Sequence, residues 1–164
     1  MKLAIAGKGG VGKTTLAGLL AGVYSSEGKS VIAIDADPDA NLAAALGIPR
    51  EEASRIVPIA QMKELIEERT GAKAGSFGAY IKLNPRVDDI PERFSVRKGN
   101  IRLMLLGTVK GGGTGCICPE STLLRSLLSH LFLQRSEVVI MDMEAGLEHL
   151  GRGTARGVDA FIVV

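Results

Sequence analysis

The sequence has no tryptophan, few other aromatic residues and only two cysteines among its 164 residues. A single cysteine pair cannot build the disulfide framework of small secreted domains. No apolar run approaches the ~18 residues that a membrane-spanning helix requires, and the N-terminal apolar stretch is too short for a signal peptide. With 20 basic and 18 acidic residues, the net charge of +2 does not argue for a nucleic-acid surface. We therefore expect a cytoplasmic protein that binds neither a membrane nor a nucleic acid.

Apolar residues make up 46% of the chain and charged residues 23%, which excludes a disordered or collagen-like protein. The length suits one domain, and we expect residues 1–164 to form it. The 21 glycines are many for this length and favour close backbone turns, as phosphate-binding loops require.

Short apolar runs alternate with helical patterns along the chain. We expect strands over residues 3–6, 30–34, 101–106, 137–141 and 159–164, and helices over residues 13–25, 39–46, 59–69 and 120–133. The least regular stretch, 72–100, is expected to be a loop or a short hairpin. This order predicts an α/β fold, with a mostly parallel sheet and helices on both faces. The last run should be a buried strand, and since no helix follows to cover it, we expect the domain to be truncated at its C-terminus.

Residues 7–14 satisfy the phosphate-binding pattern G-x-x-x-x-G-K-[ST], between a predicted strand and a predicted helix. Small residues let the backbone N–H groups of such a loop surround phosphate oxygens, and a helix N-terminus favours an anion. Lys13 would neutralise the β- and γ-phosphates, and the Thr14 hydroxyl would ligate Mg²⁺. The alternative is an ordinary glycine-rich turn with an incidental lysine. The residues expected to contact the nucleotide here are Gly9, Gly10, Val11, Gly12, Lys13, Thr14 and Thr15.

Carboxylates follow two of the predicted strands. Asp35 and Asp37 come after the second strand, and Asp142 ends a later apolar run. Ligands of open α/β sheets bind beyond the carboxyl ends of the strands. Asp37 could therefore orient a water on the γ-phosphate, Asp35 could sit near Mg²⁺, and Asp142 could hold Mg²⁺ through water. The alternative is that the earlier carboxylates form turns, with Asp39 as the N-cap of the next helix.

Both cysteines lie in Cys116-Ile117-Cys118, just before Pro119, a residue suited to the first position of a helix. Thiolates are favoured at a helix N-terminus. One C-x-C pair supplies two ligands where a closed tetrahedral site uses four, so two symmetry-related chains would complete the set. Thiolates suit Zn²⁺, Cu(I) and iron–sulfur clusters, and Ni²⁺ can occupy a square-planar sulfur site. The alternative is a pair of buried, inert cysteines.

The loop Lys-Gly-Gly-Val-Gly-Lys-Thr-Thr resembles the deviant Walker A signature of the MinD/ParA group of P-loop ATPases. The resemblance implies a MinD-like P-loop fold in which Lys8 reaches across a dimer interface to the partner's nucleotide. It also implies that Asp37, before a proline, positions the attacking water, so that Lys8, Lys13 and Asp37 are the catalytic residues. Asn41 lies in the same switch I segment and is expected to bind the nucleotide. Met143-Glu144-Ala145-Gly146 resembles switch II, where the Gly146 amide would sense the γ-phosphate.

Three segments are similar to the CooC-type ATPases, accessory proteins that help insert nickel into carbon monoxide dehydrogenase. They are residues 115–120 with the C-x-C pair, 84–91 and 142–154, and the similarity covers essentially the whole chain. It implies a homodimer that shares Ni²⁺ (or Zn²⁺) on Cys116 and Cys118, uses ATP and Mg²⁺, and serves carbon monoxide dehydrogenase as its client. Family chains continue past Val164 with elements that include contacts to the nucleotide base.

We therefore expect an ATP-hydrolysing metallochaperone with nucleotide- and metal-linked dimerisation. A MinD/ParA-type positioning ATPase would act on a membrane or DNA, and the chain shows neither a C-terminal amphipathic helix nor a basic face. An iron–sulfur ATPase such as the nitrogenase iron protein takes its cluster ligands from positions far apart in the sequence, unlike a C-x-C pair. A metal-storage module would bind metal without regard to nucleotide.

Overall fold

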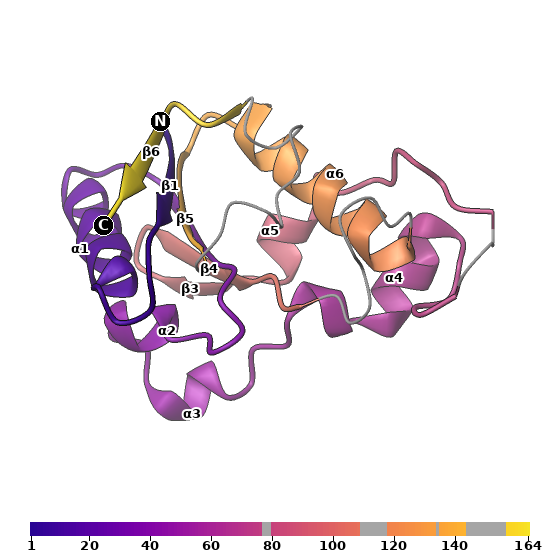
Figure 1. Ribbon diagram of the computed structural model, residues 1–164, viewed down its shortest axis with the longest axis horizontal. Helices are drawn as coiled ribbons and strands as arrows, with labels where there is room; N and C mark the ends of the chain where they lie inside the picture. Colours follow the sequence, from indigo (N-terminus) through magenta and orange to yellow (C-terminus); the bar gives the residue numbers. More distant parts are fainter. Residues whose placement is uncertain (77–79, 109–117, 134, 144–156) are drawn as a thin grey trace.

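A computed structural model describes residues 1–76, 80–108, 118–133, 135–143 and 157–164 (Figure 1). Within these residues the strands form one sheet in the order β3-β4-β2-β5-β1-β6. Every neighbouring pair is parallel except β3 and β4, which are antiparallel. The strands are β1 (Lys2–Ala6), β2 (Val31–Asp35), β3 (Val96–Lys98), β4 (Ile101–Leu105), β5 (Val138–Asp142) and β6 (Ala160–Val163).

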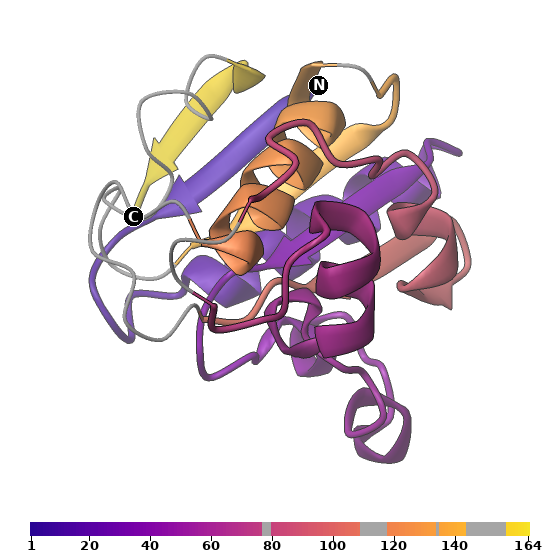
Figure 2. The same cartoon turned by 90° about the vertical axis from the view of Figure 1, so that its right-hand side faces the viewer.

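Helices cover both faces of the sheet, so the predicted α/β fold with a mostly parallel sheet is confirmed. Figure 2 shows α6 and α4 together on one face, while α1 packs against the other face with α2 beside it. Two short helices, α3 and α5, and a 3₁₀ turn, η1, lie in the connections. The helical elements are α1 (Lys13–Ser26), α2 (Leu42–Ala45), α3 (Arg50–Ala53), η1 (Ile59–Gln61), α4 (Lys63–Thr70), α5 (Ile90–Arg93) and α6 (Pro119–Leu133).

The side chains of β2 show how the sheet is buried on both sides. Ile32 and Ile34 belong to the hydrophobic cluster beneath α6 and α4, whereas Val31 and Ala33 belong to the cluster beneath α1 and α2. Successive side chains of a strand point to opposite faces, so a strand covered twice needs apolar residues at every position. This explains why the apolar runs of the sequence are continuous rather than alternating.

Two of the expected helices differ from the structure. The helix expected over 39–46 begins only at Leu42, because Ala40 has a left-handed backbone (φ 45°) that no right-handed helix can include. The helix expected over 59–69 is divided into η1 and α4 at Met62, whose ψ of 80° is not helical. In the irregular stretch 72–100, β3 forms a hairpin with the following strand β4, which agrees in part with the expected short hairpin, but residues 90–93 form helix α5, which was not predicted.

The prediction that the last apolar run is a buried strand was wrong. Within the described residues, β6 is at the edge of the sheet and pairs with β1. Phe161 is 40% exposed and Val163 is 77% exposed. An apolar run gives the composition of a strand but not its place in the sheet, and the outermost position leaves its side chains with fewer neighbours.

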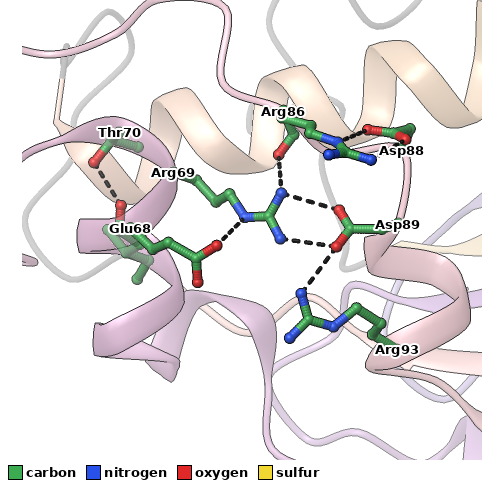
Figure 3. Close-up of polar contacts among 8 residues, drawn as sticks. Glu68, Arg69, Thr70, Arg86, Asp88, Asp89 and Arg93 are labelled. Carbon is green, nitrogen blue, oxygen red and sulfur yellow. Dashed lines mark hydrogen bonds and ion pairs between the residues drawn. The ribbon is translucent and has the colours of Figure 1, made fainter.

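A cluster of charged side chains fixes the irregular chain before α5 to α4 (Figure 3). The buried Arg69 guanidinium donates to both carboxylate oxygens of Asp89, at 3.0 and 2.8 Å, and to the carbonyl oxygen of Arg86. Arg93 donates to Asp89 as well, at 3.0 Å. These hydrogen bonds lower the pKa of Asp89 to about 2, Arg69 having the larger effect.

Among the described residues, no helix combines the length and the apolar character needed to cross a membrane.

Candidate nucleotide site

The phosphate-loop residues connect β1 to α1 at the carboxyl end of the sheet. Gly10 (φ 76°) and Gly12 (φ 95°) have left-handed backbones, which glycine adopts without strain. A Cβ atom built at Gly9, Gly10 or Gly12 would have no atom within 4 Å. Within the described parts of the chain, the backbone N–H groups of residues 9–12 donate no hydrogen bond. The loop therefore presents open space beside amide donors, as a phosphate cradle requires.

Lys13 lies inside this loop. Its side chain is only 6% exposed, and its Nζ donates to the carbonyl oxygen of Lys8 at 3.1 Å. Lys8 itself is exposed, as is Thr15, whereas Thr14 is half-buried. The buried Lys13 ammonium donates to a loop carbonyl, and phosphate oxygens could replace that carbonyl as acceptor at little desolvation cost.

Asp142, the last residue of β5, lies between β1 and β2 in the sheet. Its side chain is 1% exposed, and neither carboxylate oxygen has a hydrogen-bond partner among the described residues. Burial raises the pKa of Asp142, while a hydrogen-bond interaction with the Thr14 hydroxyl, too weak in geometry to count as a formed bond, and the charge of the Lys13 ammonium lower it. A buried carboxylate without well-formed hydrogen bonds is costly unless a cation compensates it. The group formed by Asp142, Thr14 and Lys13 therefore fits Mg²⁺ with a nucleotide phosphate.

Asp37 lies on a short loop between β2 and α2 that we call the switch loop (residues 36–41). Its Oδ1 accepts a hydrogen bond from the amide of Asp39 at 2.9 Å. Asp37 is half-buried and Asn41 is exposed, so both side chains are accessible from solvent at the carboxyl end of β2. The structure thus brings the phosphate loop, the switch loop and Asp142 to the same end of the sheet, as the sequence predicted.

The hydrogen bonds of Asp35 agree in part with the alternative that these carboxylates form turns, but its bond to Leu42 was not predicted from the sequence. Its Oδ1 accepts from the amide of Asp37 at 3.0 Å and its Oδ2 from the amide of Leu42 at 2.9 Å. The alternative role of Asp39 as an N-cap was wrong, because the first amide of α2 bonds to Asp35 instead. Burial raises the pKa of Asp35 to about 6 despite these two hydrogen bonds. The signal in the sequence for a functional Asp35 is its position as a charged residue at the end of an apolar run.

Part of the candidate metal site is visible. Cys118 is buried just before α6, and its Sγ donates to the Ser121 Oγ at 3.1 Å. Its carbonyl oxygen accepts from the amide of Thr122, so Cys118 is the N-cap residue of this helix. Cys116 and Gly146 lie outside the described residues. Among the residues that are described, no three His, Cys, Asp or Glu side chains are grouped closely enough to hold a metal ion.

The arrangement of strands, helices and phosphate loop defines a P-loop nucleotide-binding domain. Residues 2–156 match the family model described as the CobQ/CobB/MinD/ParA nucleotide binding domain. The chain belongs to this family.

Curated relatives resemble the chain over its whole length. It is 55% identical over 164 residues to the carbon monoxide dehydrogenase accessory protein CooC of Rhodospirillum rubrum, covering 100% of this chain and 62% of that protein. It is 51% identical over the same length to an uncharacterised ATP-binding protein of Methanocaldococcus jannaschii, again covering 62% of the relative. The chain thus spans about three-fifths of the length of these relatives.

Solved structures share the fold at low sequence identity. A MinC:MinD cell division complex of Aquifex aeolicus matches with a TM-score of 0.60 at 19% identity, over 99% of this chain and 55% of that one. Cobyrinic acid a,c-diamide synthase of Mycobacterium smegmatis, with bound ADP and magnesium, matches with a TM-score of 0.60 at 21% identity, over 99% of this chain and 59% of that one. These matches support the MinD-like P-loop fold.

Proposed function

We propose that this protein is an ATP-hydrolysing metallochaperone that assists nickel insertion into carbon monoxide dehydrogenase. The observation that carries the ATPase part is the buried Asp142 carboxylate, which lies beside Lys13 and Thr14 and has no well-formed hydrogen bond among the described residues. The 55% identity to the carbon monoxide dehydrogenase accessory protein CooC supports the client. The nickel cargo is proposed from the C-x-C pair, whose thiolates suit Ni²⁺.

Each residue of the nucleotide site has a role in this proposal. The amides of Gly9 to Gly12 surround phosphate oxygens, and Lys13 exchanges the Lys8 carbonyl for the β- and γ-phosphates. Thr14 and Asp142 hold Mg²⁺, which when bound neutralises phosphate charge. The remaining contacts to the nucleotide come from Val11, Thr15, Asn41 and Gly146.

The chemical step is hydrolysis of the γ-phosphate by water. Asp37 orients the attacking water through its carboxylate, one oxygen of which is held by the Asp39 amide. As the bond from water to the γ-phosphorus forms, the bond from the γ-phosphorus to the β,γ-bridging oxygen breaks, and the products are ADP and inorganic phosphate. Lys13 compensates the negative charge that develops on the departing ADP oxygen. Lys8 is exposed and therefore accessible to a second chain, which suits the role of reaching the partner's nucleotide.

Nickel is the cargo in this proposal. The thiolates of Cys116 and Cys118 from two chains complete a four-sulfur site that opens or closes with the dimer. Cys118 caps α6, so a change at this helix end would alter the position of the thiolate. Contacts to the γ-phosphate that order a switch segment are an established means of linking nucleotide state to such a change.

The ATPase part is tested by two substitutions. Lys13→Ala is expected to abolish tight ATP binding, because it removes the buried ammonium from the loop. Asp37→Ala is expected to leave ATP binding nearly unchanged and to slow hydrolysis about 100-fold. ATP binding by calorimetry and phosphate release measure the two effects separately. Hydrolysis by Asp37→Ala at the unsubstituted rate would contradict the role given to Asp37.

A further inference from the structure

Asp35 makes two hydrogen bonds that link the beginning and the end of the switch loop. The amides of Asp37 and Leu42 donate to different oxygens of the one carboxylate, at 3.0 and 2.9 Å. Asp35 is 1% exposed, so water competes little for its two carboxylate oxygens. A single buried carboxylate therefore closes the loop that carries Asp37.

The same loop is held at further points. The Ala36 amide donates to the carbonyl oxygen of Asp142, and the Ala40 amide donates to the carbonyl oxygen of Asp37. Ala40 keeps a left-handed backbone, which costs a residue with a Cβ atom about 1 kcal/mol. Such a conformation persists only where surrounding contacts determine it. Of those contacts, the bond from the Leu42 amide to Asp35 is buried and the bond from the Asp37 amide is partly buried.

We propose that Asp35 is a positioning residue for the hydrolysis proposed above, on which this inference rests: its carboxylate fixes the switch loop and thereby the orientation of the Asp37 side chain. Sequence position alone would place Asp35 near Mg²⁺. The structure favours Asp142 for that role. Among the described residues neither oxygen of Asp142 has a well-formed hydrogen bond, whereas both oxygens of Asp35 accept amide donors.

Asparagine at position 35 keeps the shape of the side chain but offers only one oxygen acceptor, so one of the two amides loses its partner. In the full chain, Asp35→Asn is expected to lower kcat for ATP hydrolysis about 10- to 100-fold. The KM for ATP and the Mg²⁺ concentration for half-maximal activity should change less than twofold, because Asp35 contacts neither group. Asp39→Asn is the matched control, since this neighbouring carboxylate is exposed and accepts no hydrogen bond among the described residues.

A double substitution distinguishes positioning from an independent effect. If Asp35 acts through Asp37, Asp35→Asn in the Asp37→Ala background causes no further loss, whereas independent effects multiply. Multiplied losses, or a tenfold higher Mg²⁺ requirement for Asp35→Asn, would overturn the proposal and leave the role of Asp37 intact. If Asp37→Ala does not slow hydrolysis, the role given to Asp37 in the proposed function is wrong, and Asp35 then has no catalytic side chain to position. If Asp35→Asn does not fold, Asp35→Ser, smaller and with one acceptor oxygen, supports the same comparison.

Discussion

Asp35 and Asp142 are register partners on the neighbouring strands β2 and β5, yet their carboxylates have opposite surroundings. Both side chains are 1% exposed. Both oxygens of Asp35 accept backbone amides, and neither oxygen of Asp142 has a hydrogen-bond partner in the described chain. This difference favours different roles for the two carboxylates. Asp35 holds backbone amides, whereas Asp142 can bind a cation.

Asp142→Asn is expected to raise thermal stability and to weaken Mg²⁺-dependent nucleotide binding. Burial already raises the pKa of Asp142, so the ionised carboxylate destabilises the empty protein and a neutral side chain removes that cost. Loss of the cation-binding charge should reduce affinity for Mg-ATP about 10- to 100-fold. Thermal unfolding without Mg²⁺ and calorimetry with it measure the two effects. A lower melting temperature together with unchanged Mg-ATP affinity would contradict this interpretation.

Two glycines of α1 are expected to respond oppositely to alanine. Gly22 is exposed, and a Cβ there meets nothing within 4 Å, so Gly22→Ala should stabilise the protein by about 1 kcal/mol through helix propensity. At Gly18 a Cβ would lie 2.9 Å from the Ala45 Cβ and 3.0 Å from the Ala45 carbonyl oxygen. Gly18→Ala should therefore force α1 and α2 apart and destabilise by about 1–3 kcal/mol. Urea unfolding of both variants provides the measurement, and equal effects would contradict the packing.

The contribution of Asp89 to stability should disappear in acid. Its pKa in the folded protein is about 2, below the ordinary 3.8, so its stabilising effect is complete above about pH 4 and is lost as the pH falls toward 2. Asp89→Asn should cost about 2 kcal/mol at pH 7, and the difference from the unsubstituted protein should shrink through this window.

Urea unfolding from pH 7 to pH 2 measures the effect of Asp89→Asn. Asp88→Asn is the control, because the ion pair of Asp88 with Arg86 is exposed and should contribute little at any pH. If the difference in unfolding free energy between Asp89→Asn and the unsubstituted protein stays constant with pH, the charge of Asp89 does not contribute to its interaction with Arg69.

Much of the sheet could be predicted because its strands are covered on both faces. The run expected over 137–141 is β5 at Val138–Asp142, and the run expected over 30–34 is β2 at Val31–Asp35. The burial of β6 could not be predicted in this way. Its exposure follows from the order of strands in the sheet, which depends on contacts between residues far apart in the chain.

The candidate site was predictable to a similar extent. The phosphate loop is a local pattern, so Lys13 and Thr14 could be assigned from sequence alone. The positioning role of Asp35 depends on a hydrogen bond from the Leu42 amide, seven residues further along the chain. The loop turns back to the end of β2 through the left-handed backbone of Ala40. Alanine does not favour that conformation, so no local propensity in the sequence indicated it.

The central claim is that ATP and a nickel ion act on one dimer of this protein. Sedimentation of the anaerobic protein, titrated with Ni²⁺ with and without a slowly hydrolysed ATP analogue, tests it most directly. The account predicts one nickel per pair of chains, a doubled mass, and an increased nickel affinity when the analogue is bound. Cys118→Ser should lose the nickel-driven change in mass while hydrolysing ATP normally. One nickel per single chain at unchanged mass would contradict the claim.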